Sequence, residues 1–319
     1  MTTVSTLDVT VLEPRLKHPT IFEKYDSLNP GEAFILHNDH DPKPLYYQLM
    51  AERGNTFSWD YLESGPKIWE IKISKNKTDI SEETIGEMVT KDYRKAQVFK
   101  SFGIDFCCGG KKTLSEVCER KGLDASKVKE QLAIIDHHSN AGENEYLKWD
   151  IGFLADYIIN THHQYIKEST SFITELANKV ARVHGGSHPE TIKVADIFTR
   201  VGEDLMLHLM KEEKVLFPYI KEVAHVHKNG GILEESVFGS TSIAIHLMEV
   251  EHEQAGEALE SIRTLTNNFT LPVDACNSYT ILYKKLDEYE SDLHKHVHLE
   301  NNILFPKTIL AENEIKKKY

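Results

Sequence analysis

Cysteine is scarce in this sequence. The 319 residues contain four, which are Cys107, Cys108, Cys118 and Cys276. So few cysteines are too sparse for a disulfide scaffold, and we expect them to be reduced thiols. Cys118 and Cys276 fall at helical positions, where we expect buried packing residues.

Long apolar runs and an excess of positive charge are also missing. No stretch approaches the roughly 20 apolar residues that span a bilayer, and the first residues lack the pattern of a secretory signal. The formal net charge of -13 disfavours nucleic acid or an anionic membrane as a partner. We therefore expect a cytoplasmic protein with no membrane or nucleic-acid partner.

The first part of the chain has the pattern of a small α/β domain, over residues 1–78. We expect residues 1 to about 20 to be irregular, and the segments AFILHN, PKPLYYQLMAERG, TFSWDYLESG and IWEIKI to form strand, helix, strand and strand. The polar stretch SKNKTDISEE that follows is the expected linker.

Residues 79–140 have the pattern of a small helical domain. ETIGEMVTKDYRKAQVFKSFG is expected to be one helix that ends at Gly103, and Thr113 with Glu116 forms a capping-box pattern. IDFCCGGKK lies between the first two helices. Thiols on this glycine-rich turn beside lysines would be reactive, although a buried pair at a helix end is the alternative.

Residues 145–319 predict a mainly α domain of four antiparallel helices, at roughly 149–183, 190–229, 239–268 and 273–313, with breaks at Gly-Gly or proline. The second and fourth helices share a repeat. HLMKEEKVLFP begins at His208 and HVHLENNILFP begins at His296. In each, a histidine and a glutamate four residues later point the same way.

Histidine is abundant, with 17 in the chain. The repeat places His208 with Glu212, and His296 with Glu300, on one face of each helix. The other helices offer His252 and either His162 or His163. Such a set suits a pair of first-row metals, and ligand type alone leaves zinc and manganese open. Any one of these histidines could instead be an ordinary helix residue, but the repeat makes coincidence unconvincing.

These motifs resemble a known family. HLMKEEKVLFP, EVEHEQAGE and HVHLENNILFP are similar to the HHE motifs of hemerythrin-like proteins. With KDYRKAQVFKSFGIDFCCGGKKTLSEVC ahead of them, the chain resembles the di-iron proteins that repair iron centres. The resemblance implies a hemerythrin-like bundle with two iron ions, held by the following residues: His162, His208, Glu212, His252, His296 and Glu300.

The resemblance also assigns further residues. His163 is the alternative for the first ligand, and His298 lies on another face from His296. Asp204 and Glu251 match acidic residues that line the approach to the metals. The N-terminal unit is similar to domains related to sulfur carriers, but Asp41 stands where those carriers have their cysteine, so sulfur transfer there is not expected.

The function that the resemblance implies is repair of iron–sulfur clusters damaged by nitrosative or oxidative stress. Damaged iron–sulfur proteins would be the partners, and a homodimer is suggested. Cys107 and Cys108 would accept or pass on iron, sulfur or nitric oxide. The alternatives are a protein that binds or senses oxygen or nitric oxide, a di-iron reductase of nitric oxide or peroxide, and a metal-free scaffold, so enzyme activity is left open.

Overall fold

The computed structural model describes residues 4–53, 56–65, 68–76, 83–107, 109–137 and 145–317. The chain divides into two compact units, residues 1–82 and 83–319, and each is described by itself. Within the described ranges no helix is long and apolar enough to cross a membrane.

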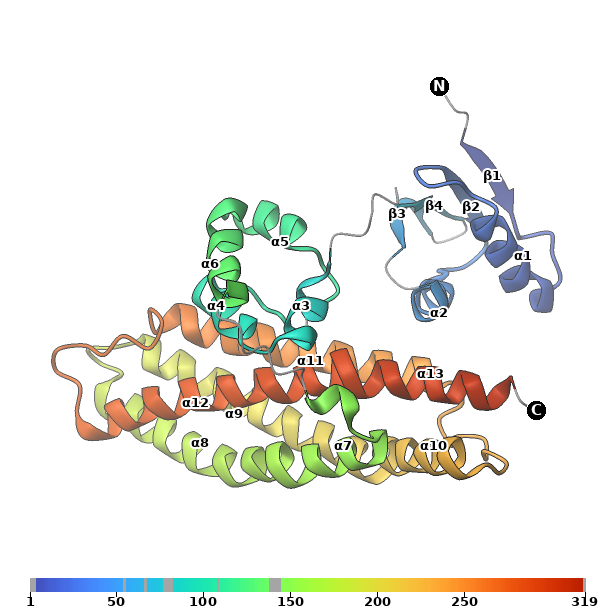
Figure 1. The fold of residues 1–319 in the computed structure, drawn as a ribbon. Helices are drawn as coiled ribbons and strands as arrows, with labels where there is room; N and C mark the ends of the chain where they lie inside the picture. The colour runs from blue at the N-terminus through green and yellow to red at the C-terminus, as the bar shows by residue number, and fades with distance from the viewer. Residues whose placement is uncertain are drawn as a thin grey trace. The chain divides into compact units, whose positions relative to one another are not determined.

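The first unit is a four-stranded sheet with two helices (Figure 1). The strands β1 (Ser5–Asp8), β2 (Ala33–Asn38), β4 (Trp69–Lys75) and β3 (Phe57–Ser64) lie in that order. β1 pairs parallel to β2, whereas the other pairs are antiparallel. The helices are α1 (Pro14–Asp26) and α2 (Lys43–Arg53).

The N-terminal segment corrects one expectation. Residues predicted to be irregular form β1 and the first part of α1. Pro14 and Pro19 lie within α1, and its buried apolar residues Ile21, Phe22 and Tyr25 are confined to its second half. The proline near the helix interior and the short apolar stretch conceal this helix from a periodicity argument.

The middle part of the chain forms four short helices, α3 (Ile85–Lys91), α4 (Lys95–Ser101), α5 (Leu114–Lys121) and α6 (Ala125–His137). The first two replace the single helix that was expected. Asp92 has extended backbone geometry, and its carboxylate accepts hydrogen bonds from the backbone N–H and the guanidinium of Arg94. This local hydrogen bonding ends α3 and allows α4 to begin. The capping box of Thr113 and Glu116 is present at α5.

Four long helical rods form the C-terminal bundle, and Figure 1 shows them side by side. Three of them are interrupted by a π-helical turn. The rods, each given in chain order, are α7 (Ile151–Ile158), the turn Ile159–His163 and α8 (Gln164–His184); α9 (Glu190–Lys211), the turn Glu212–Leu216 and α10 (Phe217–Asn229); α11 (Thr241–Leu265); and α12 (Asn277–Leu299), the turn Glu300–Leu304 and α13 (Phe305–Lys316).

Two of the π-helical turns have an evident cause in the repeat. Each is followed by Phe-Pro, and proline offers no N–H while its ring crowds the preceding turn. The helix widens there, so the N–H of Phe217 bonds to the carbonyl of Glu212, five residues back. The N–H of Phe305 bonds to the carbonyl of Glu300 in the same way. Such turns are rare and occur frequently at functional sites.

The short middle helices pack directly on the bundle. Their apolar residues share one continuous core with α8, α9, α11 and α12. Lys111 and Lys121 form ion pairs with Glu249 and Glu260 of α11, at 2.7 and 2.9 Å. The turn after the cysteine pair also lies against the turn Glu300–Leu304: a Cβ added at Gly110 would sit 3.0 Å from Oδ1 of Asn302.

Candidate metal centre

Six buried side chains converge in the bundle and form two overlapping donor groups. One group, here called the His163 cluster, consists of His163, Glu212, His296 and Glu300. The other, the His208 cluster, consists of His208, Glu212, His252 and Glu300. Each residue offers one possible ligand atom, a histidine nitrogen or a carboxylate oxygen, and within each group these atoms all lie within 4.8 Å of one another. Glu212 and Glu300 belong to both, and neither carboxylate is exposed to solvent.

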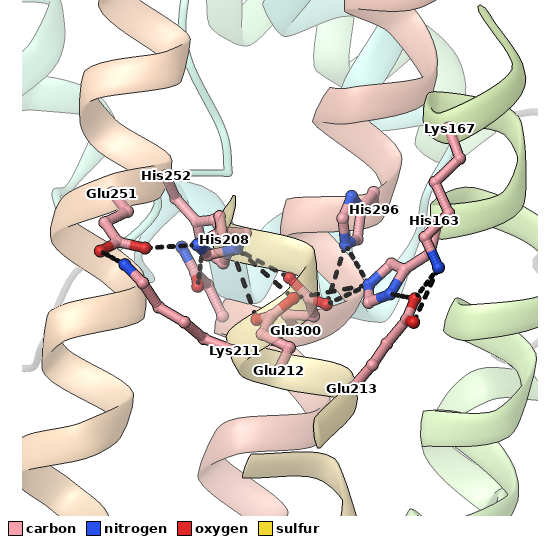
Figure 2. A network of polar contacts seen from close by, with 11 residues as sticks. His163, Lys167, His208, Lys211, Glu212, Glu213, Glu251, His252, His296 and Glu300 are labelled. Atoms are coloured by element: carbon pink, nitrogen blue, oxygen red, sulfur yellow. Dashed lines mark hydrogen bonds and ion pairs between the residues drawn. The ribbon is translucent and has the colours of Figure 1, made fainter. Parts of the chain in front are cut away.

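The two shared carboxylates lie between the clusters (Figure 2). Oε2 of Glu212 is 3.5 Å from Nε2 of His163 and 3.4 Å from Nε2 of His208. Glu300 places Oε1 2.9 Å from Nε2 of His296 and Oε2 3.1 Å from Nε2 of His252. Each carboxylate therefore reaches donors of both groups, as a bridge between two cations would require.

The two imidazoles of the His208 cluster are held in the orientation that metal binding needs. Nδ1 of His208 is 2.8 Å from Oε2 of Glu251, and Nδ1 of His252 is 2.9 Å from Oδ1 of Asn301. With its hydrogen on Nδ1, a neutral imidazole presents a lone pair at Nε2. The two Nε2 atoms nevertheless face each other at 2.9 Å. Two lone pairs at that distance repel, so a proton or a metal cation must be shared between these nitrogens.

The carboxylates also indicate that a cation binds at this site. Both oxygens of Glu212 are buried and have no hydrogen-bond donor among the described residues. A buried carboxylate without donors is costly, and metal coordination is one of the few ways to compensate it. Four imidazoles and two bridging carboxylates are a set that first-row metal pairs accept. The donor sets are consistent with a di-iron centre.

The surrounding charges show how strongly the metal-free site attracts positive charge. Burial by itself would lower the pKa of His208, but the nearby Glu212, Glu251 and Glu300 outweigh it and raise this pKa to about 10. Burial would likewise raise the pKa of Glu300, yet His296, His163 and His252 lower it well below its ordinary value. The four imidazoles and the carboxylates around them therefore stabilise each other's charged forms.

Five of the six residues expected as ligands lie in the clusters, but His162 does not. Its neighbour His163, the alternative, takes that position. Nδ1 of His162 is 2.9 Å from Oδ1 of Asp292, and its ring stacks parallel to that of His296 at 5.8 Å. The π-helical turn Ile159–His163 explains the change, because such a turn shifts the inward-facing register within the helix.

The two acidic residues expected at the approach lie beside the His208 cluster. Asp204 and Glu251 both line a groove of about 520 Å³ between α9 and α11, which His208 also lines. The carboxylate of Glu251 accepts a hydrogen bond from His208 and forms an ion pair with Lys211. The hydrogen bond with His208 lowers the pKa of Glu251, whereas burial raises it. Lys211 lowers it further, and the resulting pKa of Glu251 is about 2.

The remaining sequence candidates lie away from the clusters. His298 is buried on another face of α12, with its ring 5.6 Å from that of Tyr93 and 6.0 Å from that of Phe106. Burial lowers its pKa to about 4. Its ring therefore contacts the segments on either side of α4, and its Nδ1 lies 3.1 Å from Nδ2 of Asn302. In the N-terminal unit, Asp41 accepts a hydrogen bond from the hydroxyl of Tyr61.

Asp105 organises the described part of the cysteine motif. Cys107 is buried, and its thiol donates to Oδ1 of Asp105 at 2.9 Å. The same aspartate accepts from the backbone N–H groups of Cys107 and Gly109. Cys108 lies outside the described residues. Lys111, expected to activate the thiols, instead pairs with Glu249.

The other two cysteines behave differently from each other. Cys118 is buried, as expected. Cys276 was expected to be buried but is exposed. It occupies the position before the first residue of α12, and its Sγ is 3.1 Å from Nε2 of His184.

Sequence reasoning missed the residues that orient the imidazoles. Glu213 accepts from Nδ1 of His163 at 2.9 Å and pairs with Lys167, while Asn301 holds His252. Lys167 and Lys211 follow His163 and His208 by about one helical turn. A lysine at that spacing is the only sequence signal, and it is common on any solvated helix face.

Comparisons with known families agree with this architecture. Residues 154–308 match the family described as the hemerythrin HHE cation binding domain, and residues 81–136 match a domain of unknown function (DUF542). Residues 6–75 match an uncharacterized conserved protein family (DUF2249). The bundle and its His/Glu donors thus define a hemerythrin-like, cation-binding protein.

Curated relatives identify the family more narrowly. An iron-sulfur cluster repair protein YtfE of Musicola paradisiaca is 35% identical over 234 residues, which are 72% of this chain and 98% of the relative. A probable iron-sulfur cluster repair protein of Haemophilus influenzae is 33% identical, over 72% of this chain and 97% of its own length. The chain belongs to this family of iron–sulfur cluster repair proteins, with an added N-terminal domain.

Proposed function

We propose that this protein repairs damaged iron–sulfur clusters and that its di-iron centre supplies the iron. The observation that carries the proposal is the pair of donor clusters that share Glu212 and Glu300. Iron bound there would be held by nitrogen and oxygen ligands and would be exchangeable, unlike iron inside a sulfide-bridged cluster. The partners would be damaged iron–sulfur proteins in the cytosol, and the protein would act as a homodimer.

The donor residues and the two cysteines have separate roles in this proposal. His163, His208, His252 and His296 would hold the ions, and Glu212 and Glu300 would contribute carboxylate oxygens to both clusters. Bound iron supplies Lewis-acid and one-electron chemistry. The protein excludes bulk water, because all six side chains are buried. Cys107 and Cys108 would receive iron or sulfur on its way to the client.

The test follows the reactivation of an iron–sulfur hydratase damaged by nitric oxide. Wild-type protein loaded with iron should restore activity, and a Glu212→Ala variant should not, because loss of a bridging carboxylate weakens both clusters. A Cys107→Ala/Cys108→Ala variant should keep its iron and lose most of the repair. If the metal-free protein reactivates the hydratase equally well, iron supply is not the function.

A further inference from the structure

The two donor clusters are alike in composition but differ in how their imidazoles are held. In the His208 cluster both histidines have an acceptor at Nδ1, Glu251 for His208 and Asn301 for His252. In the His163 cluster only His163 has one, which is Glu213. Nδ1 of His296 is buried and has no hydrogen-bond partner among the described residues.

The anchoring bonds that do exist are themselves supported. Glu213 is fixed by Lys167, whose Nζ lies 2.6 and 2.7 Å from its two oxygens. Glu251 is fixed by Lys211 (Figure 2). Each cluster thus contains one histidine in a Lys–Glu–His chain that joins two helices. The difference between the clusters is confined to the second histidine.

An acceptor at Nδ1 fixes the ring orientation and makes Nε2 a better donor, and losing one typically lowers metal affinity by about 10- to 100-fold. His296 lacks this support. The two carboxylates serve both clusters and do not offset the difference.

We propose that the two ions are bound with unequal affinity and that the ion of the His163 cluster is the weaker one. Because this rests on the proposed function, the weaker ion is also the one that the protein gives up to a damaged cluster. The ion of the His208 cluster would remain bound. The chain would thus pass through a stable one-iron state during each repair.

The test compares two variants that each leave one cluster complete. Metal-free protein is titrated with Fe(II) under anaerobic conditions against a competing chelator, and metal content and Mössbauer spectra are recorded. His296→Ala should bind one ion with the tight affinity of the first wild-type step. His252→Ala should bind its one ion about 10- to 100-fold more weakly. Equal affinities, or the reverse order, would overturn the proposal.

A milder variant guards against misfolding. Asn301→Ala removes the acceptor of His252 without removing a ligand, so the first binding step should weaken and approach the second. Two unchanged steps in this variant would also overturn the proposal. The outcomes separate the two levels of inference: wild-type protein that binds no iron contradicts the proposed function, whereas two ions of equal affinity contradict only the inequality.

Discussion

Two adjacent histidines, His162 and His163, have different surroundings in this bundle. Both are buried, yet only His163 has its Nε2 among the donors of a cluster. His162 bonds to Asp292, and its own Nε2 has no partner among the residues that the structure describes. A ligand is therefore defined by which ring atom meets the carboxylates and not by burial.

Substitution of the two histidines should give clearly different results. We expect His163→Ala to lose one of the two bound irons, because it removes a donor from the weaker cluster. His162→Ala should retain both, with some loss of stability from the cavity that it leaves. Iron content per folded chain, measured after gel filtration, checks this. Loss of iron in the His162 variant alone would restore the original sequence assignment.

Iron affinity should rise with pH. In the metal-free protein the pKa of His208 is about 10, against 6.5 ordinarily, so this ring carries a proton at neutral pH that iron must displace. Each unit of pH between 6.5 and 10 should strengthen binding by about tenfold per displaced proton. The same proton stabilises the metal-free fold below pH 6.5, and that contribution is lost toward pH 10.

Binding isotherms at several pH values, corrected for the chelator, measure this dependence. The Glu251→Gln variant is the control. It removes a carboxylate that raises the pKa of His208, so the rise in affinity should level off at a lower pH. An affinity that is constant across this range would show that His208 is neutral before iron binds.

At the scale of elements, the π-helical turns set the limit of what the sequence could predict. The four long helices fall close to the ranges read from periodicity and from the Gly-Gly and proline breaks. His208 with Glu212 and His296 with Glu300 were found because each pair lies at the spacing of an ordinary helix. His163 was only an alternative, since no proline marks the turn Ile159–His163 and regular periodicity cannot choose between neighbours across it.

The close approach of the middle helices to the bundle depends on Gly86. A Cβ there would lie 2.4 Å from Oδ1 of Asn302 and 2.9 Å from the carbonyl oxygen of Gly110. We expect Gly86→Ala to lower the free energy of unfolding by about 1–3 kcal/mol, since the side chain of Asn302 and the backbone at Gly110 must both move away from the added methyl group. Gly186→Ala is the control, because an added Cβ meets no atom within 4 Å. Denaturant melts of both variants should differ by most of this amount.

At the scale of the whole molecule, the chain consists of two units that divide between residues 82 and 83. All six residues of the metal clusters and the described part of the cysteine motif belong to the second unit. The curated relatives are covered almost completely by 232–234 aligned residues, which are 72% of this chain. Those repair proteins therefore have no counterpart of the remaining part of this chain.

A fragment of residues 83–319 should fold and bind two irons per chain with the spectrum of the full-length protein. The reason is that every donor and every residue that orients a donor lies within it. Metal analysis and circular dichroism of the purified fragment test this. A fragment that folds but binds less iron would assign a metal-supporting role to the N-terminal unit.

The π-helical turns have a consequence for how such a site can be gained or lost. A π-helical turn holds one residue more than the α-helical turn it replaces, so it is equivalent to a single-codon insertion in a regular helix. Deleting one residue within Glu300–Leu304 would restore regular bonding and rotate the flanking faces of the rod by about 100° relative to each other. The helix would be more regular, but Glu300 and the core of α13 could no longer both face inward. Insertions and deletions at these three turns are therefore more decisive for iron binding than most substitutions in the bundle.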